Sequence, residues 1–204
     1  MEAETYIKSY GSFVFDLDDV LYPERDYLLQ VYYLFANFME YTEQLNAQGI
    51  IDFMKTAYEQ AGPAGIFEKA AARFGIPEQY KQNFSLLHRT AKLPLKLLVF
   101  DPVMKFMQDL VVDRKQLFLL ISGDPEQQLN KIKQVEWMGL QQYLRVYFCA
   151  EFAPKPNPES LSYLIETHEL KPEEVLVIGK RDPDEEMAGL LGVKFLEVDK
   201  LFSK

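Results

Sequence analysis

Three acidic side chains follow directly on a short apolar run near the start of the chain. Residues 13–15 read FVF, and Asp16, Asp18 and Asp19 come next. Buried strands are apolar because both of their faces are covered, so a carboxylate is costly there unless it lies at the end of the strand. In an extended segment Asp16 and Asp18 point to the same face. Two like charges held together need a cation or a shared proton, so the spacing predicts a chemical site.

Three later clusters of polar residues also follow apolar runs that are typical of buried strands. They are Ser122-Gly123 after 116–121, Lys155 after 145–150, and Gly179 to Asp184 after 174–178. In an open parallel sheet, ligands bind beyond the carboxyl ends of the strands. A carboxylate pair, a hydroxyl beside a helix start and an ammonium group together suit a phosphoryl group. We therefore expect the four clusters to meet in one site.

Alternation of strand and helix patterns predicts an α/β fold. Strands are expected at 12–16, 116–121, 145–150, 174–178 and 194–198. Helical spacing of apolar residues separates them, which argues for a parallel sheet with right-handed crossovers. In the helix expected after Ser122-Gly123, Leu129, Ile132, Val135 and Met138 share a face, and Gly139 ends it.

The segment 24–95 carries only helical patterns. They cover 24–46, 50–60, 65–74 and 77–90, with Gly49 as the first break. The sequence therefore predicts a core domain of residues 1–23 and 96–204, interrupted by a helical domain of residues 24–95. Tyr22, Glu24 and Arg25, where the chain enters the insert, are candidates for substrate contact, although Glu24 and Arg25 also suit a solvated helix start.

Composition excludes several classes of protein. The 204 residues carry 31 acidic and 22 basic side chains, a net charge of −9, and the basic residues form no stripe, which disfavours binding to nucleic acid or an anionic membrane. Residues 1–10 do not resemble a signal peptide, and no apolar run approaches the length of a spanning helix. The single cysteine, Cys149, is expected to be a buried thiol. A soluble, cytoplasmic protein is expected.

The first motif, apolar residues followed by D-x-D-x-V, resembles that of the haloacid dehalogenase (HAD) superfamily, most of whose members are magnesium-dependent phosphatases and mutases. The resemblance extends over essentially the whole chain. It implies a HAD-like Rossmannoid fold, in which a parallel five-stranded sheet has the spatial order 5-4-1-2-3. It also implies that residues 24–95 form an all-helical cap domain that excludes water and selects the substrate.

The resemblance assigns roles to individual residues. Asp16 matches the nucleophile that forms an aspartyl-phosphate, and Asp18 matches the general acid and base. Ser122 and the Gly123 N–H match the second motif, which holds phosphate oxygens. Lys155 matches the lysine that neutralises the nucleophile and the phosphate. An acidic residue at the position of Asp18 favours phosphate chemistry over dehalogenation.

The fourth motif departs from the family pattern. It reads G-K-R-D-P-D, so that Lys180 replaces a carboxylate expected to bind Mg²⁺, while Asp184 keeps the second acidic position. Mg²⁺ prefers hard oxygen ligands. Either Lys180 points to solvent and Asp184 or Asp182 joins Asp16 and the Asp18 carbonyl around Mg²⁺, or the Lys180 ammonium occupies the metal position, paired with Asp16 and Asp18.

These alternatives imply different functions. The first is a HAD-like hydrolase that cleaves a small phosphorylated metabolite, with Mg²⁺ bound by Asp16, Asp18 and Asp184. The second is a catalytically silent protein that binds a phosphorylated ligand or a protein partner. A metal-independent hydrolase is a third interpretation, and a mutase also remains open. The sequence indicates neither the substrate nor the oligomeric state.

Overall fold

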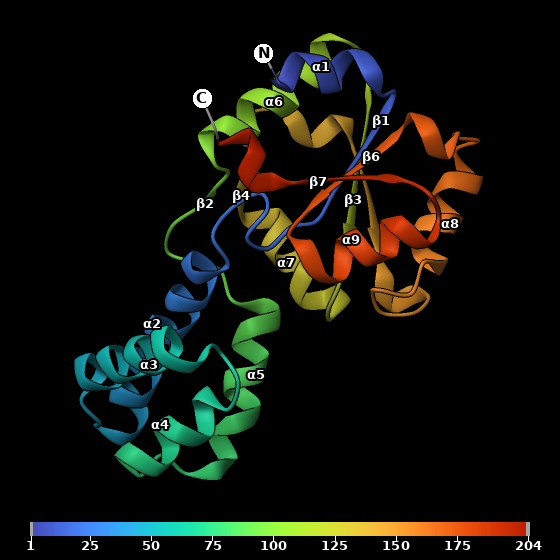
Figure 1. Cartoon of the computed structure of the whole chain (residues 1–204). Coiled ribbons are helices and arrows are strands. Elements are labelled where there is room, and N and C mark those ends of the chain that lie inside the picture. Colours follow the sequence, from blue (N-terminus) through green and yellow to red (C-terminus); the bar gives the residue numbers. More distant parts are fainter. Residues whose placement is uncertain (1, 203–204) are drawn as a thin grey trace. The chain divides into compact units, whose positions relative to one another are not determined.

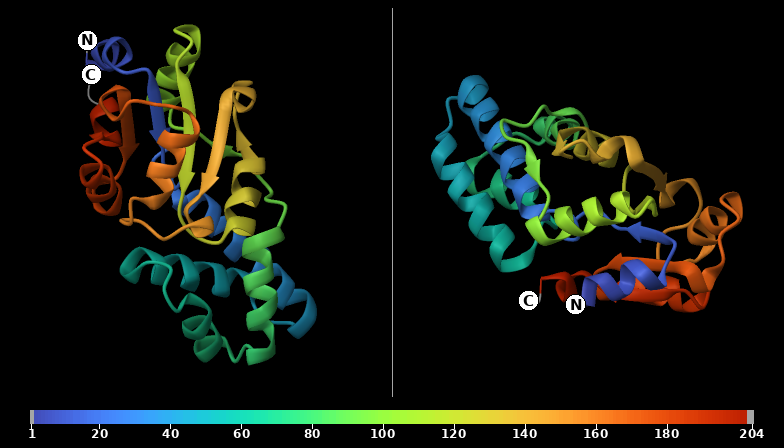
Figure 2. Two further views of the ribbon diagram at one scale, coloured as in Figure 1. Left: turned by 90° about the vertical axis from the view of Figure 1, so that its right-hand side faces the viewer. Right: turned by 90° about the horizontal axis from the view of Figure 1, so that it is seen from above.

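A parallel sheet of five strands lies at the centre of the larger of two compact units (Figure 1). The computed structural model describes the backbone of residues 2–202 and the side chains of residues 4–202. In sheet order the strands are β5 (Leu144–Phe148), β3 (Gln116–Ile121), β1 (Ser12–Phe15), β6 (Val175–Gly179) and β7 (Lys194–Glu197). Every neighbouring pair is parallel, and the arrows of β1, β3 and β5 point the same way in Figure 2, left. The predicted α/β class and strand order are confirmed.

The chain divides into a core unit and a helical unit. The core unit comprises Met1–Pro23, Leu98–Gln128 and Val135–Lys204, and the helical unit comprises Glu24–Leu97 and Leu129–Gln134. The second part of the helical unit is attached by side chains, since Asn130 Nδ2 and Gln134 Nε2 donate to the Ala91 carbonyl at 3.0 and 2.9 Å. The helical domain expected from the sequence, residues 24–95, did not include Leu129–Gln134.

The helical unit packs four helices through aromatic side chains. They are α2 (Glu24–Glu43), α3 (Ala47–Ala61), α4 (Ile66–Phe74) and α5 (Lys81–Thr90), with a 3-10 turn at Glu78–Tyr80 before α5. Phe35 of α2 lies 5.8 Å from the ring of Phe67 and 5.0 Å from that of Phe84. The expected break at Gly49 is wrong. The Asn46 side chain caps α3 by accepting the Gly49 N–H at 2.9 Å, which places Gly49 in the first turn of the helix.

Helices cover both faces of the sheet in the core unit. They are α6 (Asp101–Val112), α8 (Glu159–Thr167) and α9 (Arg181–Leu190), while α1 (Glu2–Ser9) packs against α6. Phe13 and Phe15 of β1 pack on Phe106 of α6, with ring centroids 5.7 and 6.5 Å apart. Val14 points to the opposite face, where it joins a buried cluster with Leu161 of α8 and Met187 of α9. The apolar run of β1 therefore reflects burial on both sides.

Two stretches differ from the expected elements. Residues 1–11, for which the sequence predicts no helix or strand, contain α1. The helix after Ser122-Gly123, α7 (Pro125–Gln134), ends before Gly139. It is followed by the short strand β4 (Val135–Glu136), by Met138 with a left-handed φ of 49°, and by a 3-10 turn at Leu140–Tyr143. Val135 continues the apolar spacing beyond the helix and is buried in β4, whereas Met138, which keeps the same spacing, is exposed.

The remaining elements are short. They are β2 (Leu97–Leu98) and 3-10 turns at Cys149–Glu151, Pro172–Glu174 and Val198–Leu201. Cys149 is buried, as expected, and its sulfur accepts a hydrogen bond from Ser160 Oγ at 3.6 Å. None of the helices in residues 2–202 is both long and apolar enough to cross a lipid bilayer.

Candidate active site at the carboxyl ends of the strands

Asp16 stands at the end of the central strand. Its N–H donates to the Ile178 carbonyl of β6 at 3.1 Å, which continues the pairing of β1 one residue past Phe15. The carboxylate is a quarter exposed, and its Oδ1 lies 3.3 Å from Lys155 Nζ. The predicted nucleophile is therefore fixed through its backbone, and its side chain is both accessible and paired with a cation.

The residues after Asp16 form a tight turn that carries Asp18. Asp19 adopts a left-handed φ of 57° and donates its N–H to the Tyr22 carbonyl at 2.8 Å. Asp18 Oδ1 accepts a hydrogen bond from the Tyr22 hydroxyl at 2.7 Å. Tyr22 is fully buried, so the expectation that it contacts a substrate is wrong, and it supports Asp18 instead.

Ser122 and Gly123 follow the last residue of β3. Ser122 Oγ is buried and has no hydrogen-bond partner among the described residues. Gly123 has a φ of +102°, and an added Cβ would lie 2.9 Å from Gln128 Nε2. This position therefore requires glycine on two grounds. Asp124 caps α7 through its side chain, which accepts the Gln127 N–H at 2.9 Å, as its place beside Pro125 predicts.

Lys155 is the buried cation of the site. Its side chain is 2% exposed, and its Nζ lies 2.8 Å from Asp184 Oδ1 and donates to the Leu120 carbonyl at 2.8 Å. Burial disfavours the ammonium form, but the carboxylates of Asp16 and Asp184 outweigh that effect and raise the pKa of Lys155 above its ordinary value. The lysine stays charged beside Asp16.

Asp184 is enclosed more tightly than the other carboxylates. Burial and the charge of Asp16 raise the pKa of Asp184 to about 6, against the opposing influence of Lys155. Its Oδ2 lies where a side chain on Gly179 would be, 2.2 Å from the position of an added Cβ. Asp184 therefore forms a buried ion pair with Lys155, and its role as a metal ligand stays a prediction.

Lys180 lies at the end of β6, and its side chain is 56% exposed. Its Nζ is 3.9 Å from Asp19 Oδ2. The ammonium group is thus placed beside the third carboxylate of the first motif, whereas the plugged-site interpretation pairs it with Asp16 and Asp18. An exposed pair at this distance is weak, so Lys180 is free to turn toward solvent.

The oxygen ligands available to a metal are few. In the part of the chain with described side chains, no three or more His, Cys, Asp or Glu residues are grouped so as to hold an ion. Mg²⁺ usually keeps several waters and is held by one or two carboxylates together with substrate phosphate. The Asp16 carboxylate and the Asp18 carbonyl suit such an ion, so the site fits a largely hydrated Mg²⁺.

Gln128 belongs to the site, although sequence reasoning missed it. Its Nε2 donates to the Ser122 carbonyl at 2.9 Å and to Asp18 Oδ2 at 3.3 Å. It lies in the first turn of α7, three residues after Pro125. That position in the helix after the second motif is the only signal in the sequence that points to it.

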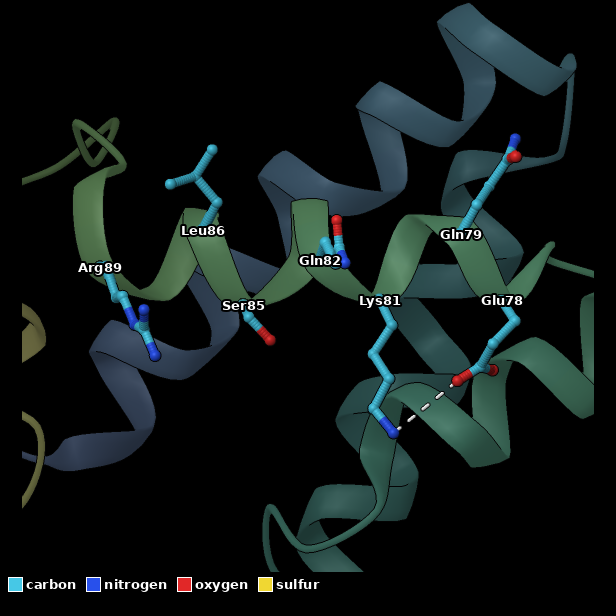
Figure 3. A pocket seen from close by; sticks show the side chains of 7 residues that line it. All are labelled: Glu78, Gln79, Lys81, Gln82, Ser85, Leu86 and Arg89. Carbon is cyan, nitrogen blue, oxygen red and sulfur yellow. Dashed lines mark ion pairs between the residues drawn. The ribbon is translucent and has the colours of Figure 1, made fainter.

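A separate hollow lies in the helical unit (Figure 3). Its volume is about 720 Å³, and its lining is mostly polar. It is lined by Glu78, Gln79, Lys81, Gln82, Ser85, Leu86 and Arg89. Lys81 is paired with Glu68 at 2.6 Å and with Glu78 at 3.8 Å. Because no predicted site residue lines it, this hollow is not the candidate active site.

Comparison with known proteins agrees with this fold. A family model described as haloacid dehalogenase-like hydrolase matches residues 13–198. A search of curated proteins finds no match.

Many solved structures have a similar fold, and three serve as examples. A hydrolase from Streptococcus pneumoniae TIGR4 is 21% identical, with a TM-score of 0.54 and coverage of 92% of both chains. A provisionally described β-phosphoglucomutase from Thermotoga maritima is 15% identical, with a TM-score of 0.62 and coverage of 93% of this chain and 95% of that one. A provisionally described phosphoglycolate phosphatase from Lactobacillus plantarum is 15% identical, with a TM-score of 0.56 and coverage of 95% and 88%. At these identities the likeness shows the fold.

Proposed function

Since the chain belongs to the haloacid dehalogenase-like hydrolases, we propose that it hydrolyses phosphomonoesters of small metabolites through an aspartyl-phosphate on Asp16. The observation that carries the proposal is the unpartnered, buried hydroxyl of Ser122 at the same sheet edge as the Asp16–Lys155 pair. A buried hydroxyl without a partner costs free energy, and a phosphate oxygen is an acceptor that would satisfy it.

Each residue then has a role in the reaction. The Asp16 carboxylate attacks phosphorus, and Asp18 gives a proton to the departing alcohol oxygen. The Ser122 hydroxyl and the Gly123 N–H donate to phosphate oxygens, while Lys155 balances the charge on Asp16 and on the phosphoryl group. Asp18 then takes a proton from the water that cleaves the aspartyl-phosphate.

The Asp16 carboxylate, the Asp18 carbonyl and Asp184 are the groups that would hold Mg²⁺. When bound, the ion supplies charge neutralisation to the phosphoryl oxygens. With Lys180 in place of a carboxylate, we expect saturation to need a high concentration of the ion. The neighbours described as a phosphoglycolate phosphatase and a β-phosphoglucomutase support phosphate chemistry in general without selecting a substrate.

The first experiment measures the hydrolysis of p-nitrophenyl phosphate over a wide range of Mg²⁺ concentration. Asp16→Asn should lower the rate of the wild type by about a thousand-fold or more, because it removes the nucleophile. Lys180→Asp should lower the Mg²⁺ concentration for half-maximal rate by at least about tenfold, since it restores a ligand. Equal rates for wild type and Asp16→Asn would contradict the proposed reaction.

A second candidate function rests on Lys180 itself. The charge of this residue near the first motif favours a silent protein that binds a phosphorylated ligand or a protein partner. In that case the wild type would be inactive at every Mg²⁺ concentration, while Lys180→Asp would be active. This pair of results separates the two functions without knowledge of the natural substrate.

A further inference from the structure

The two carboxylate oxygens of Asp18 accept hydrogen bonds from two different side chains. The Tyr22 hydroxyl donates to Oδ1 at 2.7 Å, and Gln128 Nε2 donates to Oδ2 at 3.3 Å. Both donors are shielded from solvent, Tyr22 being 0% and Gln128 6% exposed. In water-excluded surroundings such bonds are stronger than on an open surface.

Each donor is itself held in place by the backbone. The Tyr22 carbonyl accepts the Asp19 N–H at 2.8 Å, and the neighbouring Leu21 carbonyl accepts the Phe100 N–H at 2.8 Å. The orientation of the Gln128 amide is set by a second acceptor, the Ser122 carbonyl at 2.9 Å. Because Gly123 has no side chain, Gln128 can approach its backbone closely.

This support matters because Asp18 follows a strand rather than lying in one. A carboxylate on a turn can rotate, and a general acid acts only when its proton is within hydrogen-bond reach of the departing oxygen. A displacement of about 1 Å can cost about a hundredfold in rate. Each carboxylate oxygen has roughly two acceptor directions, so one donor on each oxygen restrains rotation and leaves room for the transferable proton.

We propose that Tyr22 and Gln128 are positioning residues that hold the Asp18 carboxyl group in line with the leaving oxygen. This inference rests on the proposed function. In the step concerned, the bond from phosphorus to the alcohol oxygen breaks as the bond to Asp16 forms, and the Asp18 proton moves to the alcohol. Asp18 regains a proton from the water that later attacks phosphorus and releases Asp16.

Gln128 carries a further consequence that Tyr22 does not. Its amide joins Asp18 to the backbone of Ser122, so one side chain orients both the acid and the phosphate-binding turn. Loss of the Tyr22 hydroxyl should therefore lower kcat with little change in KM. Loss of the Gln128 amide should lower kcat and also raise KM.

The test varies the leaving group. Values of kcat/KM are measured for p-nitrophenyl phosphate, whose phenolate leaves without a proton, and for an alkyl phosphate, whose alkoxide needs one. Tyr22→Phe should lose less than about threefold on the aryl ester but about ten- to a hundredfold on the alkyl ester. Gln128→Met, which also disturbs the phosphate-binding turn, should lose more than Tyr22→Phe on both esters and still lose about tenfold more on the alkyl than on the aryl ester. Asp18→Asn should show the same dependence with a larger amplitude.

A matched control is Tyr27→Phe. It also removes a buried phenolic hydroxyl, in this case one that donates to the His88 carbonyl in the helical unit. This variant should keep the wild-type dependence on the leaving group. Thermal unfolding of every variant shows whether the protein is folded, and Gln128→Met tests the same carboxylate independently if Tyr22→Phe does not fold.

The possible outcomes distinguish the positioning role of Tyr22 and Gln128 from the proposed function. Equal losses on the aryl and alkyl esters, with an active wild type, would overturn the positioning role and leave the proposed function standing. A wild type that hydrolyses neither ester at any Mg²⁺ concentration would overturn the proposed function together with this inference.

Discussion

At the scale of single residues, the buried lysine of the site differs from the exposed one. Lys155 is enclosed between two carboxylates, whereas Lys180 has one distant partner and is largely in solvent. We expect Lys155→Met to lower the free energy of unfolding by about 3 kcal/mol, because it leaves buried carboxylates without a cation. Lys180→Met should change it by less than about 1 kcal/mol. Urea unfolding at neutral pH measures both, and similar values for the two variants would contradict this account.

The hydroxyl of Tyr32 is a second instance of a buried group without a partner. The ring stacks on Phe84 at 6.1 Å, but the hydroxyl makes no hydrogen bond to any part of the chain that the structure describes. Burial raises the pKa of Tyr32. Tyr32→Phe should raise the free energy of unfolding by about 1 kcal/mol, since it removes an unsatisfied donor. A loss of stability in urea unfolding would show that the hydroxyl has a partner.

Sequence reasoning located single residues well where a strand positions them. Asp16, Ser122 and Lys180 each follow a recognisable apolar run, so their common edge could be predicted. Gln128 could not, because a glutamine in a helix has no distinctive pattern. The pairing of Lys180 with Asp19 depends on the left-handed φ of Asp19, which no spacing of residue types reveals.

At the scale of elements, the junction of β6 and α9 leaves no space for a methyl group. An added Cβ on Gly179 would meet Asp184 Oδ2 at 2.2 Å, and Asp184 cannot move without leaving Lys155. Gly179→Ala should therefore lower the free energy of unfolding by about 1–3 kcal/mol and also impair turnover. The measurement is chemical denaturation together with the p-nitrophenyl phosphate assay.

Gly189 in α9 provides the matched control for that substitution. Nothing lies within 4 Å of an added Cβ there, and alanine favours the helix over glycine. Gly189→Ala should raise the free energy of unfolding by about 0.5–1 kcal/mol with no loss of turnover. If both variants lose stability alike, the close approach of Asp184 to Gly179 is not the cause.

Elements with apolar residues on every face were the easiest to predict. The runs of β1, β3 and β6 are buried almost throughout, so their composition alone marks them. The end of α7 was harder because Val135 keeps the helical spacing while belonging to β4. Helix α1 lacks a strong apolar pattern, and its existence depends on packing rather than on local preference.

At the scale of the whole molecule, stability should depend on pH through the helical unit. Burial, with a smaller effect of Lys131, lowers the pKa of His88 to about 4. In the unfolded chain the same group titrates near its ordinary value of 6.5. The unfolded state therefore binds more protons between these values, and stability falls as pH drops from about 6.5 to about 4.

The variant His88→Phe tests this dependence, since it keeps an aromatic ring against Phe84. Between about pH 6.5 and about pH 4, the free energy of unfolding of the wild type should fall by on the order of 3 kcal/mol more than that of the variant. His168 is present in both proteins, so its effect on the pH dependence of the free energy of unfolding cancels in the comparison. If the free energy of unfolding changes equally with pH in the two proteins, the assignment to His88 is wrong.

The register of the sheet separates the residues that hold the fold together from the side chains of the candidate site. Phe15 of β1 pairs with Leu119 of β3 and with Ile178 of β6, and the side chains of the candidate site come from the residues that follow the strands. Natural selection can therefore exchange one reactive side chain while the strands that carry the others stay as they are. A lineage that loses or alters its reaction in this way keeps its ancestral architecture. Lys180 lies at such a position, one residue past the last paired residue of β6, so shared ancestry constrains the shape of such proteins far more closely than their chemistry.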